Sequence, residues 1–353
     1  MSEAETPLAE VFRRLIRNTG PISLAQFMAE SNARYYTTRD PLGADGDFVT
    51  APEISQMFGE LIGLWFADMW IRGGRPDPVA WVELGPGRAT LTRDALRTMK
   101  RYGLSPEVHF VETSPALREV QMGAVPQAQF HADLEGLPMD CPLLIVGNEF
   151  LDALPVRQLV RAGDGWRERM VGLDGERFVY VAGRQPMEAA VPEDRRDADE
   201  GTIIETSPAS AAILYEIAGR LASQGGCALL IDYGHDAVRT GSTVQAVRAH
   251  RKVDPFAAPG EADLTAHVDF ATLARVAQSR EVTWMGTRTQ GDWLRALGIE
   301  TRAEALAQRA PHYRAELTAQ RDRLIADDQM GDLFKVMGLA APGWPQGVGF
   351  ETE

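Results

Sequence analysis

The stretch 79–91 constrains the fold more than any other part of this chain. It consists of an apolar run, Val79–Val82, then the acid Glu83, a turn that contains Gly85 and Gly87, and a run suited to a helix. A strand, a glycine turn and a helix in this order build the ligand pocket of a parallel α/β sheet, where ligands bind at the carboxyl ends of the strands. Glycine lacks a Cβ, so the turn can approach a ligand closely. We therefore expect a nucleotide-type pocket at the end of this strand.

The residues around the turn distinguish between two kinds of nucleotide ligand. An acid at position 83 disfavours a pyrophosphate and suits a ligand that carries a cation or an amine. A dinucleotide fingerprint needs a small residue at its sixth position, where this chain has Thr90, and Pro86 stiffens the loop further. These features favour S-adenosylmethionine (AdoMet) as the cofactor, bound by Glu83, Gly85 and Gly87. An NAD-dependent dehydrogenase remains the alternative, and a lack of NAD(H) binding would exclude it.

Further apolar runs follow at intervals that leave room for helices between them. The candidate strands are 108–112, 129–133, 143–146 and 227–232. Strands that alternate with helices predict a doubly wound, mostly parallel sheet of the Rossmann-like type. Two later runs, at 282–285 and 333–337, are expected to pair as an antiparallel hairpin. A long helical stretch at about 302–326 is expected to cover part of the sheet or of the site.

Two regions depart from this alternation. Residues 1–76 have mostly helical periodicity, and the glycine- and proline-rich stretch 72–76 marks a boundary. Residues 155–206 contain short strand-like runs joined by Gly/Asp turns, which predicts a β insertion. We therefore expect an N-terminal helical region with a loop that covers the cofactor, followed by an α/β domain over 77–353 that carries the insertion.

The charge and the cysteine content narrow the function further. The chain of 353 residues carries a formal net charge of −14, whereas proteins that bind nucleic acids usually present a basic surface. We therefore expect no nucleic-acid partner, and a basic protein partner suits the negative field better. No apolar run approaches the roughly 20 residues of a membrane span. Cys141 and Cys227 lie far apart, so we expect no disulfide framework, no metal site and a cytoplasmic protein.

Two acids beyond the glycine turn are candidates for contacts with adenosine. Glu112 ends the second candidate strand, where a carboxylate can accept hydrogen bonds from both ribose hydroxyls. The alternatives are that Glu112 caps the helix that starts near Thr113–Pro115, or that it is an exposed acid. Asp133 ends the third candidate strand and is placed to meet the adenine amine, with an ordinary loop aspartate as the alternative.

A polar segment, 147–155, follows the fourth candidate strand. In this fold class the end of that strand faces the group to be transferred, and buried polar residues there either find partners or serve a ligand. Two carboxylates three residues apart lie on one face of a helical turn. We therefore expect Asn148, Glu149 and Asp152 to be catalytic. The alternative is that Asn148 caps a helix and that the acids favour the dipole of its N-terminus.

A second polar cluster lies at 263–269. Asp263 and His267 are candidates for contacts with the substrate. The structural alternatives are that Asp263 caps a helix near Phe270 and that His267 is a buried imidazole whose hydrogen bonds are satisfied.

Four segments of this chain together resemble one known family, the MidA-like class I methyltransferases, whose mitochondrial member assists the assembly of respiratory complex I. The segments are Gly46–Ser55, Glu83–Arg88, Gly147–Val156 and Asp263–Phe270, and they span nearly the whole chain. One departure is Ala89, where the family usually has glycine. Alanine is small, so we expect binding to be retained with a slightly altered loop.

The resemblance implies AdoMet-dependent methylation of a protein arginine, on a subunit of complex I. For this chain the corresponding acceptor is a subunit of the bacterial NADH dehydrogenase, and the implied role is support of its assembly. We expect the segment 48–55 to close over the cofactor, with Thr50 and Pro52 in contact with it. Two alternatives stay open: an assembly factor that binds AdoMet only as a structural ligand, and a methyltransferase for a small molecule. The oligomeric state stays open as well.

Overall fold

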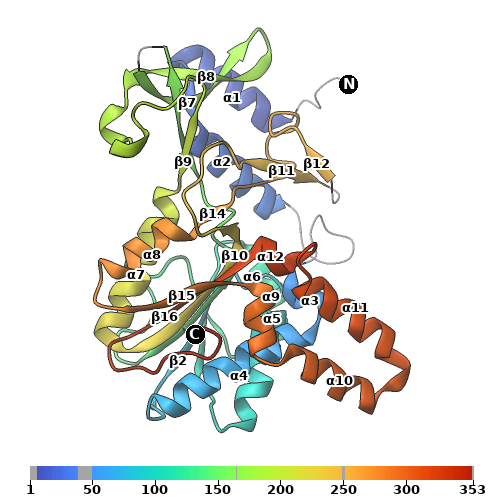
Figure 1. The fold of residues 1–353 in the computed structure, drawn as a ribbon. Coiled ribbons are helices and arrows are strands. Elements are labelled where there is room, and N and C mark those ends of the chain that lie inside the picture. Colours follow the sequence, from blue (N-terminus) through green and yellow to red (C-terminus); the bar gives the residue numbers. More distant parts are fainter. Residues whose placement is uncertain (1–5, 39–49, 164, 249–250, 352–353) are drawn as a thin grey trace. The chain divides into compact units, whose positions relative to one another are not determined.

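The computed structural model describes residues 6–38, 50–163, 165–248 and 251–351 (Figure 1). The acidic N-terminus, most of the loop before Thr50 and the first four residues of the segment Gly46–Ser55 lie outside these ranges. The chain divides into two compact units that alternate along the sequence. The first unit contains Met1–Pro41, Asp152–Ser210 and Ala237–Asp269, and the second contains Leu42–Leu151, Ala211–Asp236 and Phe270–Glu353.

The second unit is built on a mixed, mostly parallel sheet with the strand order β15-β16-β10-β5-β2-β3-β4. Its parallel strands are β2 (Ala80–Leu84), β3 (Glu107–Val111), β4 (Gln129–His131), β5 (Leu143–Asn148) and β10 (Gly226–His235). At one edge β15 (Thr283–Thr289) and β16 (Phe334–Ala340) pair antiparallel, as expected. The predicted fold class is therefore confirmed.

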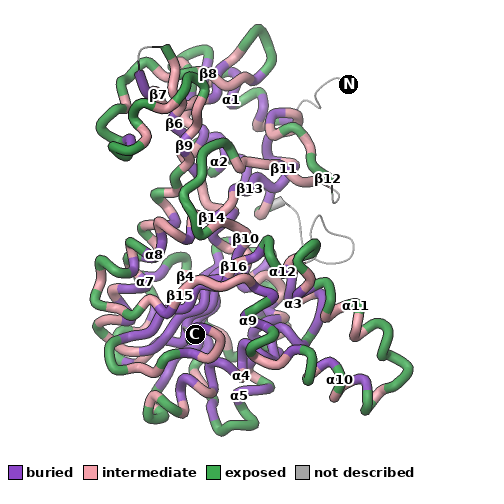
Figure 2. Tube along the Cα trace, in the orientation of Figure 1, coloured by how far each residue is buried: buried purple, intermediate pink, exposed green. Residues whose placement is uncertain are grey.

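The central strands are apolar because helices cover both of their faces. Every residue of β2 and of β5 is buried. Figure 2 shows buried segments gathered in the interior of this unit. The helices of this unit include α4 (Gln56–Arg72), α5 (Thr90–Arg101), α6 (Pro115–Ala124), most of α7 (Pro208–Gln224) and α8 (Phe270–Gln278). The core is rich in aromatic side chains, among them Trp65, Phe66 and Trp81, and the rings of Phe66 and Trp81 meet edge to face. This core holds β2 and its glycine turn in place.

The helical stretch expected at 302–326 is two helices, so that prediction is corrected. These are α10 (Ile299–Arg309) and α11 (Arg314–Ile325), separated by a short 3-10 turn, Pro311–Tyr313. Proline has no backbone N–H and disfavours helical geometry at the residue before it. Pro311 therefore ends α10 at this point.

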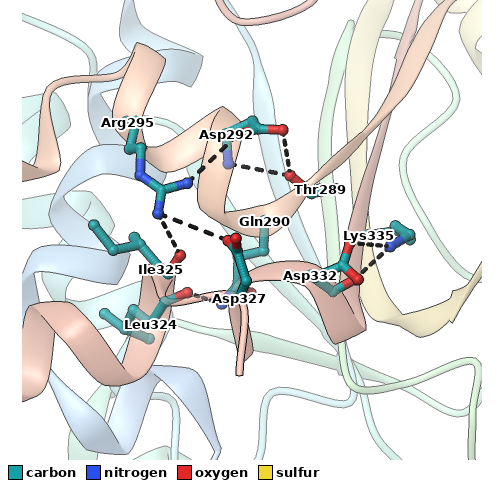
Figure 3. Close-up of polar contacts among 9 residues, drawn as sticks. All are labelled: Thr289, Gln290, Asp292, Arg295, Leu324, Ile325, Asp327, Asp332 and Lys335. Atoms are coloured by element: carbon teal, nitrogen blue, oxygen red, sulfur yellow. Dashed lines mark hydrogen bonds and ion pairs between the residues drawn. The ribbon is translucent and has the colours of Figure 1, made fainter. Parts of the chain in front are cut away.

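Two side chains of the short helix α9 (Gln290–Ala296) hold the C-terminal end of α11 (Figure 3). Gln290 Nε2 donates to the carbonyl of Leu324 and Arg295 Nη2 donates to the carbonyl of Ile325, each at 2.8 Å. The last carbonyls of a helix have no partner within the helix. These two donors therefore satisfy carbonyls that the end of α11 leaves free. A further short helix, α12 (Met330–Leu333), follows α11.

The described residues of the first unit include two long α-helices and two small antiparallel sheets. The helices are α1 (Pro7–Thr19) and α2 (Leu24–Thr38). One sheet contains β1 (Ile22–Ser23), β6 (Arg157–Ala162), β7 (Gly165–Asp174), β8 (Arg177–Pro186) and β9 (Ile203–Thr206), and its last four strands lie within the predicted β insertion. The other contains β11 (Gln245–Arg248), β12 (Arg251–Val253) and β13 (Asp263–Thr265). The two-residue strand β14 (Val268–Asp269) ends the unit. Phe12, Phe27, Phe178 and Phe256 form its core.

Candidate active site

The glycine turn after β2 has the geometry that a close ligand requires. Gly85 and Gly87 adopt φ angles of 60° and 54°, in the left-handed region that favours glycine. The N–H of Gly85 donates to the carbonyl of Val111 at 3.0 Å, which ties the turn to the end of β3. A Cβ on Gly85 would lie 2.9 Å from a ring carbon of Phe150. The turn therefore has no room for a side chain at this position.

Glu83 lies beneath this turn and points toward α5. Its side chain is buried and accepts a hydrogen bond from the hydroxyl of Thr92, which in turn accepts one from the indole N–H of Trp81 at 2.6 Å. Burial raises the pKa of Glu83 to about 8, although the hydrogen bonds with Thr92 act in the opposite direction. The carboxyl group is therefore mostly protonated at neutral pH in the absence of a ligand.

Glu112 follows β3 directly and is joined to the glycine turn through one side chain. Gln121 Nε2, on α6, donates to the carbonyl of Gly87 at 2.8 Å and to Glu112 Oε2 at 3.2 Å. Glu112 Oε1 accepts from the N–H of Ser114 at 2.7 Å. Ser114, not Glu112, is the N-cap of α6, so the alternative role of Glu112 as helix cap is corrected. Each carboxylate oxygen retains a further lone pair for a ligand.

Asp133 lies just past β4 and is exposed. Its Oδ1 accepts from the N–H of Glu135 at 3.0 Å, which closes a local turn. Because the parallel strands end at one edge of the sheet, the residues after β2, β3, β4 and β5 lie along that edge. The structure therefore brings Glu83, Gly85, Gly87, Glu112, Asn148 and Glu149 together there, with Asp133 on the outermost strand.

Asn148 and Glu149 form one hydrogen-bonded unit at the end of β5. Asn148 Nδ2 donates to Glu149 Oε1 at 3.1 Å, and the same oxygen accepts from the N–H of Ala51 at 3.1 Å. Asn148 is 8% exposed, and its Oδ1 is buried with no hydrogen-bond partner among the described residues. An unsatisfied buried acceptor is costly unless a ligand supplies a donor. Asn148 therefore presents an acceptor to whatever binds at this edge.

The segment after Asn148 is a turn, so the helix expected there is wrong. Glu149 has φ 52°, in the left-handed region, and the residues that follow it form a bend and a turn. Asp232, on β10, fixes the turn, because its Oδ2 accepts from the N–H groups of Phe150 and Leu151 at 3.1 and 2.9 Å. Asp232 is 1% exposed. The sequence shows that Asp232 follows an apolar run, but it does not show that this carboxylate binds the backbone of Phe150 and Leu151.

The short helix α3 (Ala51–Ile54) connects Glu149 to the glycine turn. The N–H of Ala51 binds Glu149, and Glu53 accepts from the hydroxyl of Thr90, the first residue of α5, at 2.5 Å. Thr50 is the N-cap residue of α3 and Pro52 lies in its first turn. Both candidates therefore lie at the start of a helix that contacts Glu149 and the first residue of α5.

The remaining candidates, Asp152, Asp263 and His267, belong to the first unit. Asp263 lies in β13 and accepts from the hydroxyl of Tyr36 at 3.0 Å, so the expectation that it caps a helix near Phe270 is wrong. Asp152 lies next to the residue after β13, because its carbonyl accepts from the N–H of Ala266 at 3.0 Å. His267 is half-buried, and its backbone N–H donates to Thr243 Oγ1 at 2.8 Å.

Sequence reasoning missed two residues of α2 that organise this cluster. Asn32 exchanges two hydrogen bonds with the backbone of Leu264 and donates a third to the carbonyl of Ala153 at 2.9 Å. Tyr36, one helical turn further on, binds Asp263. The spacing of four between Asn32 and Tyr36 was visible, but nothing in the sequence linked α2 with β13.

These features together define a class of protein. A mostly parallel α/β sheet carries a glycine turn with no space for a Cβ after β2. An acid follows β3, on one side of β2, and an unsatisfied buried acceptor ends β5, on the other side. This is the fold of a class I methyltransferase, and the residues present at this edge fit an adenosyl cofactor.

Comparisons with known proteins specify the family. A family model with the description "Putative S-adenosyl-L-methionine-dependent methyltransferase" matches residues 61–287. The protein arginine methyltransferase NDUFAF7, mitochondrial, of Mus musculus is 36% identical to this chain. The match covers 96% of this chain and 85% of that protein. Its counterpart in Homo sapiens is 36% identical, with 95% of this chain and 84% of that protein covered.

A solved structure supports the same assignment. The crystal structure of a protein from Burkholderia thailandensis bound to S-adenosyl-homocysteine matches with a TM-score of 0.84 and 26% identity, and the match covers 99% of this chain and 97% of that one. The chain belongs to the family of AdoMet-dependent methyltransferases that contains the NDUFAF7 proteins. The resemblance to the MidA-like methyltransferases is thereby confirmed, and AdoMet is the cofactor. Among the described residues, no helix has the length and apolarity needed to cross a membrane.

Proposed function

We propose that this protein methylates an arginine side chain of a polypeptide. The observation that carries the proposal is the arrangement at the end of β5, where the carboxylate of Glu149 is fixed by Asn148 and by the backbone of Ala51. Support for arginine as the acceptor comes from the names of the relatives, which are protein arginine methyltransferases at 36% identity.

Glu149 suits the chemistry of an arginine acceptor. A guanidinium group is protonated at any working pH, and its nitrogen lone pairs are delocalised. A fixed carboxylate orients the plane of the group through paired hydrogen bonds. It also favours positive charge on the nitrogens that it binds, which leaves lone-pair density on the nitrogen that will react. The bound cofactor supplies a methyl group on a cationic sulfur. In this proposal Glu149 orients the acceptor and takes up its proton, Asn148 positions Glu149, and Asp152 contributes a second carboxylate.

We assign the cofactor to the edge formed by the glycine turn and its neighbours. Gly85 and Gly87 line it with backbone, Glu112 binds the ribose hydroxyls, and Asp133 meets the adenine amine. Glu83, on the strand that leads into the turn, is held by the hydroxyl of Thr92. The helix α3, with Thr50 and Pro52, covers the same edge. The hydrogen bonds from Gln121 to Gly87 and to Glu112 support this assignment, because they fix the glycine turn and Glu112 relative to each other.

The acceptor that we propose is a subunit of the NADH dehydrogenase, methylated during assembly of the complex. This step rests on the family resemblance alone. We also propose a cytoplasmic location. The two cysteines, Cys141 and Cys227, are free and buried, which suits a reducing compartment.

The test is mass spectrometry of NADH dehydrogenase subunits from cells that carry the wild-type gene, no gene, or the variant Glu149→Gln. We expect a methylated arginine only with the wild type, because the amide cannot accept a proton. Calorimetry should show nearly unchanged S-adenosyl-homocysteine affinity for Glu149→Gln. The matched control is Glu119→Gln, an exposed position on α6, which should retain methylation.

Three outcomes would contradict the proposal. Equal loss of methylation and of cofactor affinity would make Glu149 a cofactor ligand. Normal assembly with the transfer-inactive variant would favour a binding factor that holds AdoMet as a structural ligand. Transfer of a tritiated methyl group from the cofactor to metabolites, with no label on protein, would favour a small-molecule acceptor.

A further inference from the structure

A polar cluster in the first unit gathers around Tyr36. The hydroxyl of Tyr36 donates to Asp263 Oδ1 at 3.0 Å, and Asp263 is 5% exposed. Asp152 is 6% exposed, and its backbone carbonyl binds the N–H of Ala266, directly after β13. Burial is the main cause that raises the pKa of Tyr36 well above its usual value. The negative charges of Asp263 and Asp152 raise this pKa further. Two buried carboxylates therefore lie near one phenol.

Thr265 adds an unsatisfied group to the same place. It is 1% exposed, and its hydroxyl has no hydrogen-bond partner among the residues that the structure describes. Residues two apart in a strand share a face, so Thr265 and Asp263 lie on the same face of β13, about 7 Å apart. Leu264, between them, packs into the apolar core of the unit on the other face. The hydroxyl of Thr265 is therefore a buried group with no hydrogen bond to the described part of the chain, on the same face of β13 as Asp263.

The backbone around this cluster is fixed. Asn32 makes three hydrogen bonds that join α2 to Leu264 and to Ala153. Asn32 and Tyr36 are four residues apart, so they lie on the same face of α2, which packs against β13. The two acids, the phenol and the threonine are therefore held on three segments that cannot shift independently.

The acceptor groups suit a planar cation better than a compact one. A guanidinium presents five N–H donors in a rigid fork that matches carboxylates on two sides, whereas an ammonium is a strongly hydrated point charge with three donors. We propose that Asp152, Asp263 and Thr265 form a guanidinium-binding site in the first unit and that Tyr36 is the residue that positions Asp263 within it. This inference rests on the proposed function, since it supplies the selectivity of that reaction for arginine over lysine.

The test measures binding of two matched peptides, acetyl-Gly-Arg-Gly-amide and acetyl-Gly-Lys-Gly-amide, to the full chain saturated with S-adenosyl-homocysteine. We expect the arginine peptide to bind at least about tenfold more tightly, as paired charge-assisted hydrogen bonds would require. Asp263→Asn should weaken the arginine peptide about 10- to 100-fold. Tyr36→Phe and Thr265→Val, which preserve shape, should weaken it severalfold and lower the arginine-to-lysine ratio toward one.

Two variants in the same unit serve as controls. Tyr180→Phe removes a phenol that stacks on Arg169, and Asp174→Asn removes an exposed acid on β7. Both should leave the affinity ratio unchanged. A simply structural role of Tyr36 would lower thermal stability and leave this ratio intact, which would overturn its role as a positioning residue.

The outcomes separate this inference from the proposed function. Equal binding of the two peptides, or a ratio that Asp263→Asn does not change, would overturn the inference even where mass spectrometry finds methylated arginine. Selective binding of the arginine peptide without any methylated subunit would support the site and contradict the proposed acceptor instead.

Discussion

The ionisation of Glu83 shows how one buried side chain affects the whole protein. Its pKa is raised to about 8 in the folded chain by burial, whereas an exposed glutamate titrates near 4.5. Between these pH values the folded state holds a proton that the unfolded state has released. The free energy of unfolding therefore falls as pH rises from 4.5 to 8 and levels off above that, in the absence of ligand.

Glu83→Gln should remove this dependence. The variant has no proton to lose, so its advantage over the wild type should grow through pH 4.5–8 and reach on the order of 3 kcal/mol at pH 7. Urea denaturation at several pH values measures the difference. Glu135→Gln, at an exposed position, should show none. A constant difference across this range would mean that Glu83 is ionised in the folded chain.

Gly85 gives a second prediction at the residue scale. A side chain at this position would clash with Phe150, and a β-branched residue would also be strained in the left-handed backbone geometry. The turn must move to relieve the clash. Gly85→Val should therefore weaken S-adenosyl-homocysteine binding by about 100-fold or more. Gly103→Val is the control: its φ is 81°, but a Cβ there meets nothing within 4 Å. It should cost stability and leave binding unchanged. Calorimetric affinities that fall equally in both variants would remove the turn from the cofactor site.

At the scale of elements, the end of α11 depends on donors from α9. Gln290 is fully buried, and its loss would leave the carbonyl of Leu324 without a donor (Figure 3). An unsatisfied buried carbonyl costs about 1–3 kcal/mol. Gln290→Ala should therefore lower the free energy of unfolding by at least that amount and speed hydrogen exchange in α11. Gln308→Ala, an exposed position on α10, should do neither; protection of α11 that survives Gln290→Ala would contradict this role.

The sequence predicted elements well where a local pattern determines them. The central strands β2, β5 and β10 contain apolar runs, and the glycine turn carries its own signal in Gly85 and Gly87. The break between α10 and α11 also had a signal, Pro311, that outweighs the helical periodicity around it. The turn at Glu149 had none, because nothing local predicts left-handed geometry at a glutamate.

The polar clusters could not be predicted from local patterns. Tyr36 and Asp263 meet only after α2 packs on β13, and Thr92 reaches Glu83 only after α5 packs on β2. Each contact depends on tertiary structure, so the residue types gave candidates but not partners. For the same reason Asp232 and Asn32 were visible as polar residues and not as the groups that fix the loops.

At the scale of the whole molecule, a ligand that binds the folded chain should raise its free energy of unfolding. S-adenosyl-homocysteine and NAD+ can therefore be distinguished by their effects on stability. S-adenosyl-homocysteine at a hundred times its Kd adds about 2.7 kcal/mol to the free energy of unfolding. For a chain of this length that is a rise in Tm of about 3–4 °C. NAD+ should produce no shift at the same concentration. A shift with NAD+ and none with S-adenosyl-homocysteine would contradict the assigned cofactor.

The interleaved order of the two units has a consequence for anyone who wishes to dissect the protein. Three stretches of each unit alternate along the chain, so five covalent connections join them. No single truncation yields either unit intact, and one proteolytic nick leaves both still tethered. To isolate either unit, distant stretches of the chain would have to be joined by new linkers. Point substitutions are therefore the practical way to assign a function to each unit.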